Sequence, residues 1–461
     1  MKGAATIAAG GFFAKVIGAL YRIPLTNLIG GYGIGLYQLV YPVYCLLLTV
    51  SATGIPSSIA KLTAERIGKG ENEKPVFQTA MKLFLLIGGF GALLMAAIAP
   101  ALARAQGSES VQAGYYTLAP SVFLVSAISV FRGWFQGRND MLPTALSEIT
   151  EQLVKVAFGL LFAYLFRNNV EKAVVFLLLA VSLSELFALV LMMILYKRAP
   201  MLKKEGETQK EGGRVAMKTV LRLSIPVTFS SILLPLSALL DSVLAVRLMS
   251  AYAENAVTLY GLFSGGAVTV INLPVSVCYG IAAASIPAVA AASASVKSAQ
   301  TAQEGQTNGR AKNGVRRKLF FALGVTVAVA LPAAAGLYLF AEPVARLIFR
   351  SLAGEELAVL VKLIKIFSVS AFTLSCTQTL SACLTAQGKP KYAALSMLIA
   401  VAVKTATYVF LLRDPAVSVF GLAHATNVCY LVAFLLDLVY NIGVSRRSGK
   451  RAKHGVKIKQ D

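Results

Sequence analysis

Long apolar runs separated by short polar segments make up most of the chain. A helix needs about 20 mostly apolar residues to cross the hydrocarbon core of a bilayer. The sequence therefore predicts an all-α membrane protein with about twelve transmembrane helices. The predicted spans lie near 5–27, 34–58, 78–103, 113–135, 142–166, 173–196, 223–247, 259–289, 319–341, 357–385, 392–412 and 415–441.

The first run has the beginning of a signal peptide, Met1 and Lys2 followed by apolar residues. It also contains Lys15 and Arg22, and it continues to about Asn27 without a convincing cleavage site. We therefore expect it to be retained as the first span.

The basic residues between the runs predict the orientation. With a cytoplasmic N-terminus, the cytoplasmic segments contain 30 of the 44 Lys and Arg residues, and the opposite loops contain seven. Cytoplasmic loops of membrane proteins carry an excess of Lys and Arg. We therefore expect both termini in the cytoplasm and an even number of spans.

The charged segment 197–222 divides the chain into two halves that share a local pattern. Gln-Gly-Arg at 136–138 precedes Ala-Leu-Ser at 145–147, and Gln-Gly-Lys at 387–389 precedes Ala-Leu-Ser at 394–396. Each copy lies between the fourth and fifth spans of its half, as expected of a parallel repeat around a central cavity. We predict an N-terminal six-helix lobe at 1–205, a C-terminal six-helix lobe at 206–445 and a basic cytoplasmic tail at 446–461. The polar stretch 291–317 resembles a flexible linker.

Composition agrees with a membrane protein and excludes several other classes. Of 461 residues, 57% are hydrophobic and 14% are charged, against about 25% charged in ordinary soluble domains. The net charge of +23 would suggest nucleic acid in a soluble protein. Here the charge lies in loops and in the tail, so the expected partners are anionic membrane lipids and not nucleic acid.

The sequence contains no set of residues typical of an enzyme or a metal site. It has two histidines, no Cys-x-x-Cys pair and no Walker motif. We therefore expect neither an enzyme nor a bound cofactor or metal, and leave open a coupling ion or the membrane potential as the source of energy.

Charged side chains within the spans are the best functional candidates, because a charge at the bilayer centre costs about 2.5–3.5 kcal/mol. Lys15 and Arg22 are seven residues apart and share one helix face. A cationic face in a membrane cavity suits an anion such as phosphate or pyrophosphate. Glu151 and Lys155 have the favourable i,i+4 order for an ion pair. The full set of substrate-binding candidates is Lys15, Arg22, Gln38, Glu148, Glu151, Lys155, Asp241 and Arg247.

Other polar residues of the spans have two interpretations. Tyr37, Tyr41 and Tyr44 follow one another at helical spacing, as either a packing stripe or a surface for stacking on sugar rings. Asp437 is near the end of its span, so we expect it to reach the membrane surface. We also expect the first, second and fifth spans to face the cavity together.

Three blocks of sequence resemble the stage V sporulation protein B family of polysaccharide biosynthesis flippases. They are FAKVIGALYRIPLTNLIGGYGIGLYQ from Phe13, FRGWFQGRNDMLPTALSEITEQLVKV at 131–156, and LLDSVLAVRLMS with the following LYGLFSGGAVTVINLPVSVCYGIAAASIPAVA. This family is similar to the MurJ lipid II flippases and belongs to the multidrug/oligosaccharidyl-lipid/polysaccharide exporter superfamily.

The resemblance implies a function and a site. Two six-helix lobes would flip an undecaprenyl-pyrophosphate-linked sugar, a peptidoglycan precursor or an oligosaccharide, across a bacterial cytoplasmic membrane. Lys15 and Arg22 would help to bind the pyrophosphate. The chain differs from such flippases in having twelve predicted spans where they usually have fourteen.

Two other classes of function remain open. A cation-coupled multidrug antiporter would need acidic groups in the cavity, and Glu148, Glu185 and Asp241 are available. A scaffold that binds envelope-synthesis proteins without transport is the third class. A basic cavity favours the flippase, and an acidic cavity favours the antiporter.

Overall fold

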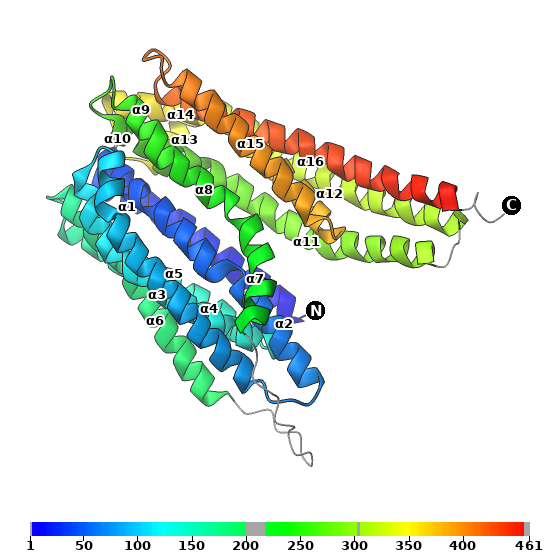
Figure 1. Ribbon diagram of the computed structural model, residues 1–461. Helices are drawn as coiled ribbons and strands as arrows, with labels where there is room; N and C mark the ends of the chain where they lie inside the picture. The colour runs from blue at the N-terminus through cyan, green and yellow to red at the C-terminus, as the bar shows by residue number, and fades with distance from the viewer. Residues whose placement is uncertain (1, 200–216, 302–304, 456–461) are drawn as a thin grey trace. The chain divides into compact units, whose positions relative to one another are not determined.

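The computed structural model describes residues 2–199, 217–301 and 305–455, and they form helices without any β-sheet (Figure 1). The helices of the first part of the chain are α1 (Lys2–Leu48), η1 (Thr49–Thr53), α2 (Ile55–Gly68), α3 (Lys74–Ala105), η2 (Glu109–Val111), α4 (Gln112–Gly137), α5 (Leu142–Leu165) and α6 (Val170–Arg198). Those of the middle are α7 (Met217–Ser231), α8 (Leu233–Leu240), η3 (Asp241–Ala245), α9 (Val246–Met249), α10 (Ala256–Gly261), η4 (Leu262–Ala267) and α11 (Val268–Thr301). The last are α12 (Gly305–Leu339), α13 (Ala341–Ile348), α14 (Gly354–Ala386), α15 (Pro390–Leu411) and α16 (Val419–Gly455).

Each of the twelve predicted spans lies on one helix or on a run of consecutive helices, which confirms the all-α membrane class. Among the described residues, nine helical stretches are long and apolar enough to cross a membrane. The first of them, Val16–Gly68, is 53 residues long and contains two predicted spans. Helix α5 is not among the nine, although its 24 residues suffice to cross a bilayer. Its three charged residues lower its hydropathy.

The structure corrects one prediction about the linker. Helix α11 continues to Thr301 and α12 begins at Gly305. The stretch 291–317, predicted as a flexible linker, is therefore helical on both sides of the three residues that the structure does not describe. Its alanines and glutamines favour a helix, and the composition alone did not show this.

The chain forms two compact units. Unit 1 contains Met1–Gly266 together with Ile348–Glu356, and unit 2 contains Ala267–Leu347 and Leu357–Asp461. Residues 217–266 thus pack with unit 1, because α8 and α10 contact α1, although the sequence places them in the second half. The lobe boundaries 1–205 and 206–445 are predicted from the sequence repeat. The division into compact units does not test that repeat, so these boundaries stay a prediction.

Helix α1 organises unit 1, with α4, α5, α6, α8 and α10 packed along it. A bend at Gly30 divides α1, since this residue has φ 69° and ψ −177°, a conformation available only to glycine at low cost. Two further glycines bring α1 and α10 into close contact. A Cβ on Gly35 would lie 2.2 Å from the carbonyl oxygen of Val257, and one on Gly261 would lie 2.3 Å from that of Gly31.

The short segment Ile348–Glu356 is fastened to α1 beside this bend. The Asn27 side chain donates from Nδ2 to the Ile348 carbonyl at 3.0 Å, and its Oδ1 accepts from the Ser351 amide at 3.2 Å. One amide group thus binds the backbone of the segment twice. The chain on both sides of the segment belongs to unit 2, so these bonds explain why the segment itself packs with unit 1.

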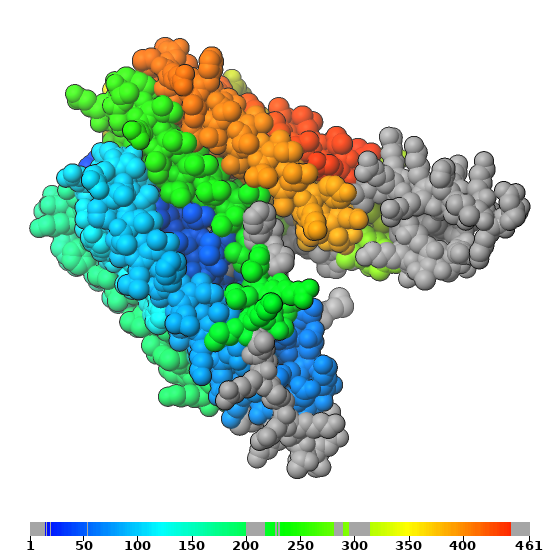
Figure 2. Space-filling view, in the orientation of Figure 1, coloured from blue at the N-terminus to red at the C-terminus, as the bar shows by residue number. Residues whose placement is uncertain are grey.

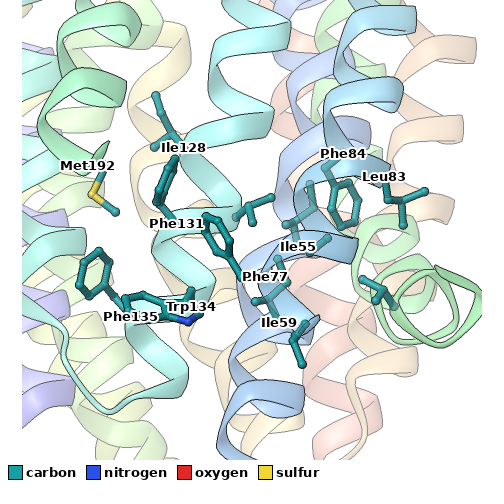
Figure 3. Close-up of a cluster of buried hydrophobic side chains, with 14 of the residues drawn as sticks. Ile55, Ile59, Phe77, Leu83, Phe84, Ile128, Phe131, Trp134, Phe135 and Met192 are labelled. Atoms are coloured by element: carbon teal, nitrogen blue, oxygen red, sulfur yellow. The ribbon is translucent and has the colours of Figure 1, made fainter. Parts of the chain in front are cut away.

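Aromatic side chains fill the core between α2, α3, α4 and α6 (Figure 3). The Phe77 ring stacks on Tyr196 with centroids 4.5 Å apart, and it lies 5.1 Å from the Phe131 ring. Trp134 meets Tyr196 edge-on at 4.8 Å. In Figure 2, side chains coloured light blue to turquoise are packed closely together on the face of unit 1 that the view shows.

Unit 2 has a polar network in its interior. The Asp437 carboxylate of α16 is 1% exposed and accepts hydrogen bonds from the hydroxyl groups of Ser381 in α14 and Ser396 in α15. Gln387 and Asn441 extend the network, with Gln387 Nε2 donating to Asn441 Oδ1 at 2.9 Å. Asp437 therefore does not reach the membrane surface, contrary to our prediction. It joins three helices instead.

We expect Gly35→Ala to lower the free energy of unfolding by about 1–3 kcal/mol, the usual cost of overpacking, because the new methyl group would meet a backbone carbonyl that cannot move aside. The midpoint of thermal unfolding in detergent, followed by size-exclusion chromatography, measures this change. Gly324→Ala is the matched control, since a Cβ there meets no atom within 4 Å. Equal midpoints for the two variants would contradict the close packing of α1 and α10.

Candidate functional site

Four helices of unit 1 bring charged side chains together inside the membrane-spanning part of the fold. Arg22 comes from α1, Arg132 from α4, Glu151 and Lys155 from α5, and Glu185 from α6. We call these five residues the charge cluster. Helices α1, α4 and α5 are mutual neighbours, and α6 packs against all three, so the cluster lies at the centre of unit 1.

An ion pair of the cluster joins α4 to α5. Arg132 Nη2 lies 3.3 Å from Glu151 Oε2, and both side chains are largely buried, at 14% and 19% exposure. Arg132 Nε also donates to the Ser147 hydroxyl at 2.9 Å. Glu151 Oε1 accepts from Gln152 Nε2 at 3.4 Å. The Arg132 guanidinium therefore bridges two turns of α5.

This pair corrects our prediction for Glu151 and Lys155. The i,i+4 spacing predicts that they pair with each other, but the Glu151 carboxylate binds Arg132 instead. Among the described residues, no carboxylate lies within 4.0 Å of Lys155 Nζ. The broader form, one shared polar network, stays a prediction, and the charges of Glu151, Glu185 and Arg22 all act on Lys155.

Arg22 and Lys155 are the two cations of the cluster outside this pair. Both are half-buried, and each lies close enough for its charge to act on the other and on Cys45. Arg22 also acts on the hydroxyl groups of Tyr37 and Tyr41. Two like charges repel each other in an apolar environment, and a bound anion would attract both of them and offset this repulsion.

The three tyrosines of α1 form a packed row beside the cations. The Tyr37 and Tyr41 rings stack with centroids 5.1 Å apart, and Tyr41 lies 5.6 Å from Tyr44. Tyr37 and Tyr44 are buried. The Tyr44 hydroxyl donates to Glu185 Oε1 at 3.2 Å. This arrangement favours the packing stripe for Tyr37 and Tyr44, while the half-buried Tyr41 is the member more open to a ligand.

The remaining predicted site residues have different surroundings. Gln38 is buried and donates from Nε2 to the Ser264 carbonyl at 3.3 Å, so its amide ties α1 to η4. Asp241 is buried in η3, and Glu148 is half-buried on α5. Arg247 is exposed on α9. The side chain of Lys15 lies outside the described residues, so its predicted role stays a prediction.

The sequence alone did not identify Arg132 as a site residue, and it did not predict the hydrogen bond of Tyr44 to Glu185. Arg132 is five residues before the end of α4, and from the sequence it counts among the basic residues of a cytoplasmic segment. The sequence predicts Tyr44 only as one of three tyrosines at helical spacing. Arg132 lies three positions inside the predicted end of the span 113–135. That placement is the signal that would have marked it for pairing with an acid on the next span.

The described part of the chain contains no group of three or more His, Cys, Asp or Glu residues that could hold a metal ion. The chemistry available in the charge cluster is therefore that of guanidinium, ammonium and carboxylate groups. Such groups recognise anions through charge-assisted hydrogen bonds.

The comparison with known sequences identifies the family. The sequence profile of polysaccharide biosynthesis proteins matches residues 1–293. The chain belongs to this family. Its members include flippases and related transporters, so family membership supports a transporter of the membrane and not an enzyme.

Two relatives come from Bacillus subtilis (strain 168). Stage V sporulation protein B is 26% identical over 301 residues, which cover 63% of this chain and 58% of that protein. The lipid II flippase MurJ is 22% identical over 480 residues, which cover 99% of this chain and 84% of that protein. The match to the first relative thus spans little more than half of its length.

A solved structure shares the fold. The inward-facing conformation of a multidrug resistance MATE family transporter of the MOP superfamily aligns with a TM-score of 0.74 over 95% of this chain and 96% of that chain, at 16% identity. This likeness confirms the transporter fold expected from the sequence.

We expect the Arg132–Glu151 pair to behave as a coupled unit. Breaking a buried pair by removing one partner typically costs about 3–5 kcal/mol, because a charge is left without its counter-charge, whereas replacing both partners by apolar residues is often nearly neutral. Arg132→Met and Glu151→Leu should therefore each lower the unfolding midpoint more than the double variant does. The measurement is thermal unfolding of the four proteins in detergent.

The matched control is the Glu342–Arg346 pair of α13, whose side chains are 56% and 64% exposed. An exposed i,i+4 pair is worth about 0.3–0.5 kcal/mol, so the same cycle there should show almost no coupling. Additive effects at Arg132 and Glu151 would show that the two residues act independently.

Proposed function

We propose that the protein is a flippase that moves an undecaprenyl-pyrophosphate-linked sugar, a peptidoglycan precursor or an oligosaccharide, from the inner to the outer leaflet of a bacterial cytoplasmic membrane. Both termini lie in the cytoplasm in this proposal, as the distribution of Lys and Arg predicts. The name of the relative MurJ describes transport of lipid II, which supports a lipid-linked glycan as the substrate class.

The observation that carries the proposal is the proximity of Arg22 and Lys155 inside the membrane-spanning part of unit 1. Each cation raises the electrostatic energy of the other, and the nearby Glu151 is already bound to Arg132. A ligand with several negative charges, such as a pyrophosphate, would stabilise both cations at once. Lys15 shares a helix face with Arg22 in the sequence and would add a third cation.

The steps of transport follow from this site. The pyrophosphate binds at the cations, the glycan occupies the aqueous space beside them, and the polyprenyl chain stays in the lipid. Alternating access of the two lobes then exposes the site to each side in turn. We propose that Glu148, Asp241 and Arg247 also contribute to substrate binding, as the sequence predicts.

The charge cluster also supports a second candidate, a cation-coupled multidrug antiporter. Glu185 is an almost fully buried carboxyl group on α6, and the solved multidrug transporter has the same fold. The flippase is favoured because Arg22 and Lys155 repel a cationic drug. Depletion of the protein followed by mass spectrometry of polyprenyl-linked intermediates distinguishes the two, since only loss of a flippase makes such intermediates accumulate.

We expect Arg22→Ala to abolish transport while the protein still folds and inserts. The lost charge-assisted hydrogen bonds should weaken substrate binding by about 1.5–3 kcal/mol, roughly ten- to a hundredfold. Arg22→Lys should restore transport in part, because an ammonium group cannot make the two parallel hydrogen bonds of a guanidinium. Complementation of a flippase-depleted strain measures transport, with protein levels in membranes determined in parallel.

Arg346→Ala is the control, since this exposed arginine pairs only with its own helix neighbour among the described residues. It should complement fully. Full complementation by Arg22→Ala at a normal protein level would remove Arg22 from the site. Full complementation by Arg22→Lys would point to a structural charge and not to bidentate recognition.

A further inference from the structure

Glu185 is a buried acid that the proposed site does not yet use. It lies on α6 with 2% of its surface exposed. The Tyr44 hydroxyl donates to Oε1 at 3.2 Å. The second oxygen, Oε2, has no hydrogen-bond partner among the described residues. Asp437, the buried acid of unit 2, differs because hydroxyl groups bind both of its oxygens.

The geometry at Glu185 fits the protonated acid. An ionised carboxylate accepts hydrogen bonds at both oxygens, and an ionised oxygen without a donor is far more costly to bury than a neutral hydroxyl group without an acceptor. Since Tyr44 serves one oxygen and nothing among the described residues serves the other, the carboxyl group is better matched to its surroundings with a proton on Oε2.

Lys155 is the cation that would respond to loss of this proton. Its charge interacts with that of Glu185, yet Lys155 forms no ion pair within 4.0 Å among the described residues. Glu151, the other acid near Lys155, is bound to Arg132. The ammonium group therefore has two competing counter-charges, an ionised Glu185 or an anionic ligand.

The other titratable groups around Glu185 do not offer the same exchange. Helix α6 packs against α1, α4, α5 and η2, and η2 meets it near Glu171, about 21 Å along the helix from Glu185 at 1.5 Å per residue. Tyrosine and cysteine side chains titrate at alkaline pH, and Glu151 has its own cation. The charged and titratable groups that act on Glu185 or on Lys155 are Arg22, Tyr44 and Cys45 of α1, Arg132 of α4, and Glu151 of α5.

We propose that Glu185 is a proton-binding site and that its proton is linked to anion binding at Lys155. With the proton bound, Lys155 is available to the anion. Without the proton, the carboxylate draws Lys155 into an ion pair and the anion loses a contact. This inference rests on the proposed function, because it takes Lys155 to be part of the anion site.

The linkage has a definite sign. An anion that takes Lys155 leaves Glu185 without a counter-charge, so Glu185 takes up a proton when the anion binds. By reciprocity, a proton on Glu185 strengthens anion binding. The apparent affinity for the anion should fall as the pH rises through the titration of Glu185, by at most about tenfold per pH unit for one proton. The proton also reduces the net charge that the loaded site holds within the membrane.

Proton uptake on anion binding tests the proposal. The purified full-length protein in detergent is titrated with inorganic pyrophosphate by calorimetry, in two buffers of different ionisation enthalpy at each of several pH values, because uptake occurs only where Glu185 is ionised in the free protein. The difference in heat gives the number of protons taken up per anion bound. We expect the wild type to take up more protons than Glu185→Gln, by up to about one. Protonation of pyrophosphate itself contributes equally to both proteins and cancels in the difference.

Two further variants complete the experiment. Asp437→Asn, a buried acid with both oxygens hydrogen-bonded, should keep the proton uptake of the wild type. Tyr44→Phe removes the hydrogen bond that stabilises the ionised form of Glu185, so the pH dependence of pyrophosphate binding should move to higher pH. This variant keeps the acid and serves where Glu185→Gln fails to fold, as judged by size-exclusion chromatography.

The outcomes separate the two proposals. Equal proton uptake by the wild type and a folded Glu185→Gln, or a folded Glu185→Gln that no longer binds pyrophosphate, would overturn the role of Glu185 and leave the flippase proposal standing. An unchanged pH dependence in Tyr44→Phe would also overturn it. Failure of the wild type to bind pyrophosphate at any pH would instead remove the anion site on which both proposals depend.

Discussion

Charged side chains inside a membrane need an opposite charge or a hydrogen-bond partner within the protein. This requirement determines how the charged residues of unit 1 are arranged. Arg132 and Glu151 come from consecutive spans and meet this requirement for each other. Their pairing takes the Glu151 carboxylate away from Lys155, the partner that helix spacing suggests. Lys155 and Arg22 then lie close together with charges of the same sign. The anion site proposed for this protein follows from that pairing, since a Glu151 bound to Lys155 would have left Arg132, and not Lys155, without this counter-charge.

Close packing of small residues along α1 places this cluster. Gly35 and Gly261 let α1 and α10 approach until a Cβ would meet a backbone oxygen, and Gly30 bends α1 next to them. Asn27 fastens the segment Ile348–Glu356 to the same part of α1.

The two buried acids illustrate how the same side-chain chemistry serves different purposes. Asp437 receives two hydroxyl donors and joins α14, α15 and α16. Glu185 accepts one hydrogen bond, from Tyr44, and lies close enough to Lys155 for the two charges to interact. A fully bonded carboxyl group stabilises the packing of its helices, whereas one with an unbonded oxygen keeps the capacity to gain or lose a proton when its neighbours change. Burial alone does not distinguish the two, and the number of donors does.

The sequence by itself determined the fold class, the helices and the family. Apolar runs of about 20 residues leave few alternatives to a membrane helix because the bilayer offers no hydrogen bonds to the backbone, and each predicted span indeed lies on helical structure. It also selected Arg22, Glu151 and Lys155 as charges in need of an explanation. Only the tertiary structure decided the partners: Arg132 for Glu151, Ser264 for Gln38, and Ser381 and Ser396 for Asp437. Helical periodicity reports which residues share a face of one helix, whereas a buried charge is compensated by whichever neighbouring helix brings an opposite charge or a donor to it.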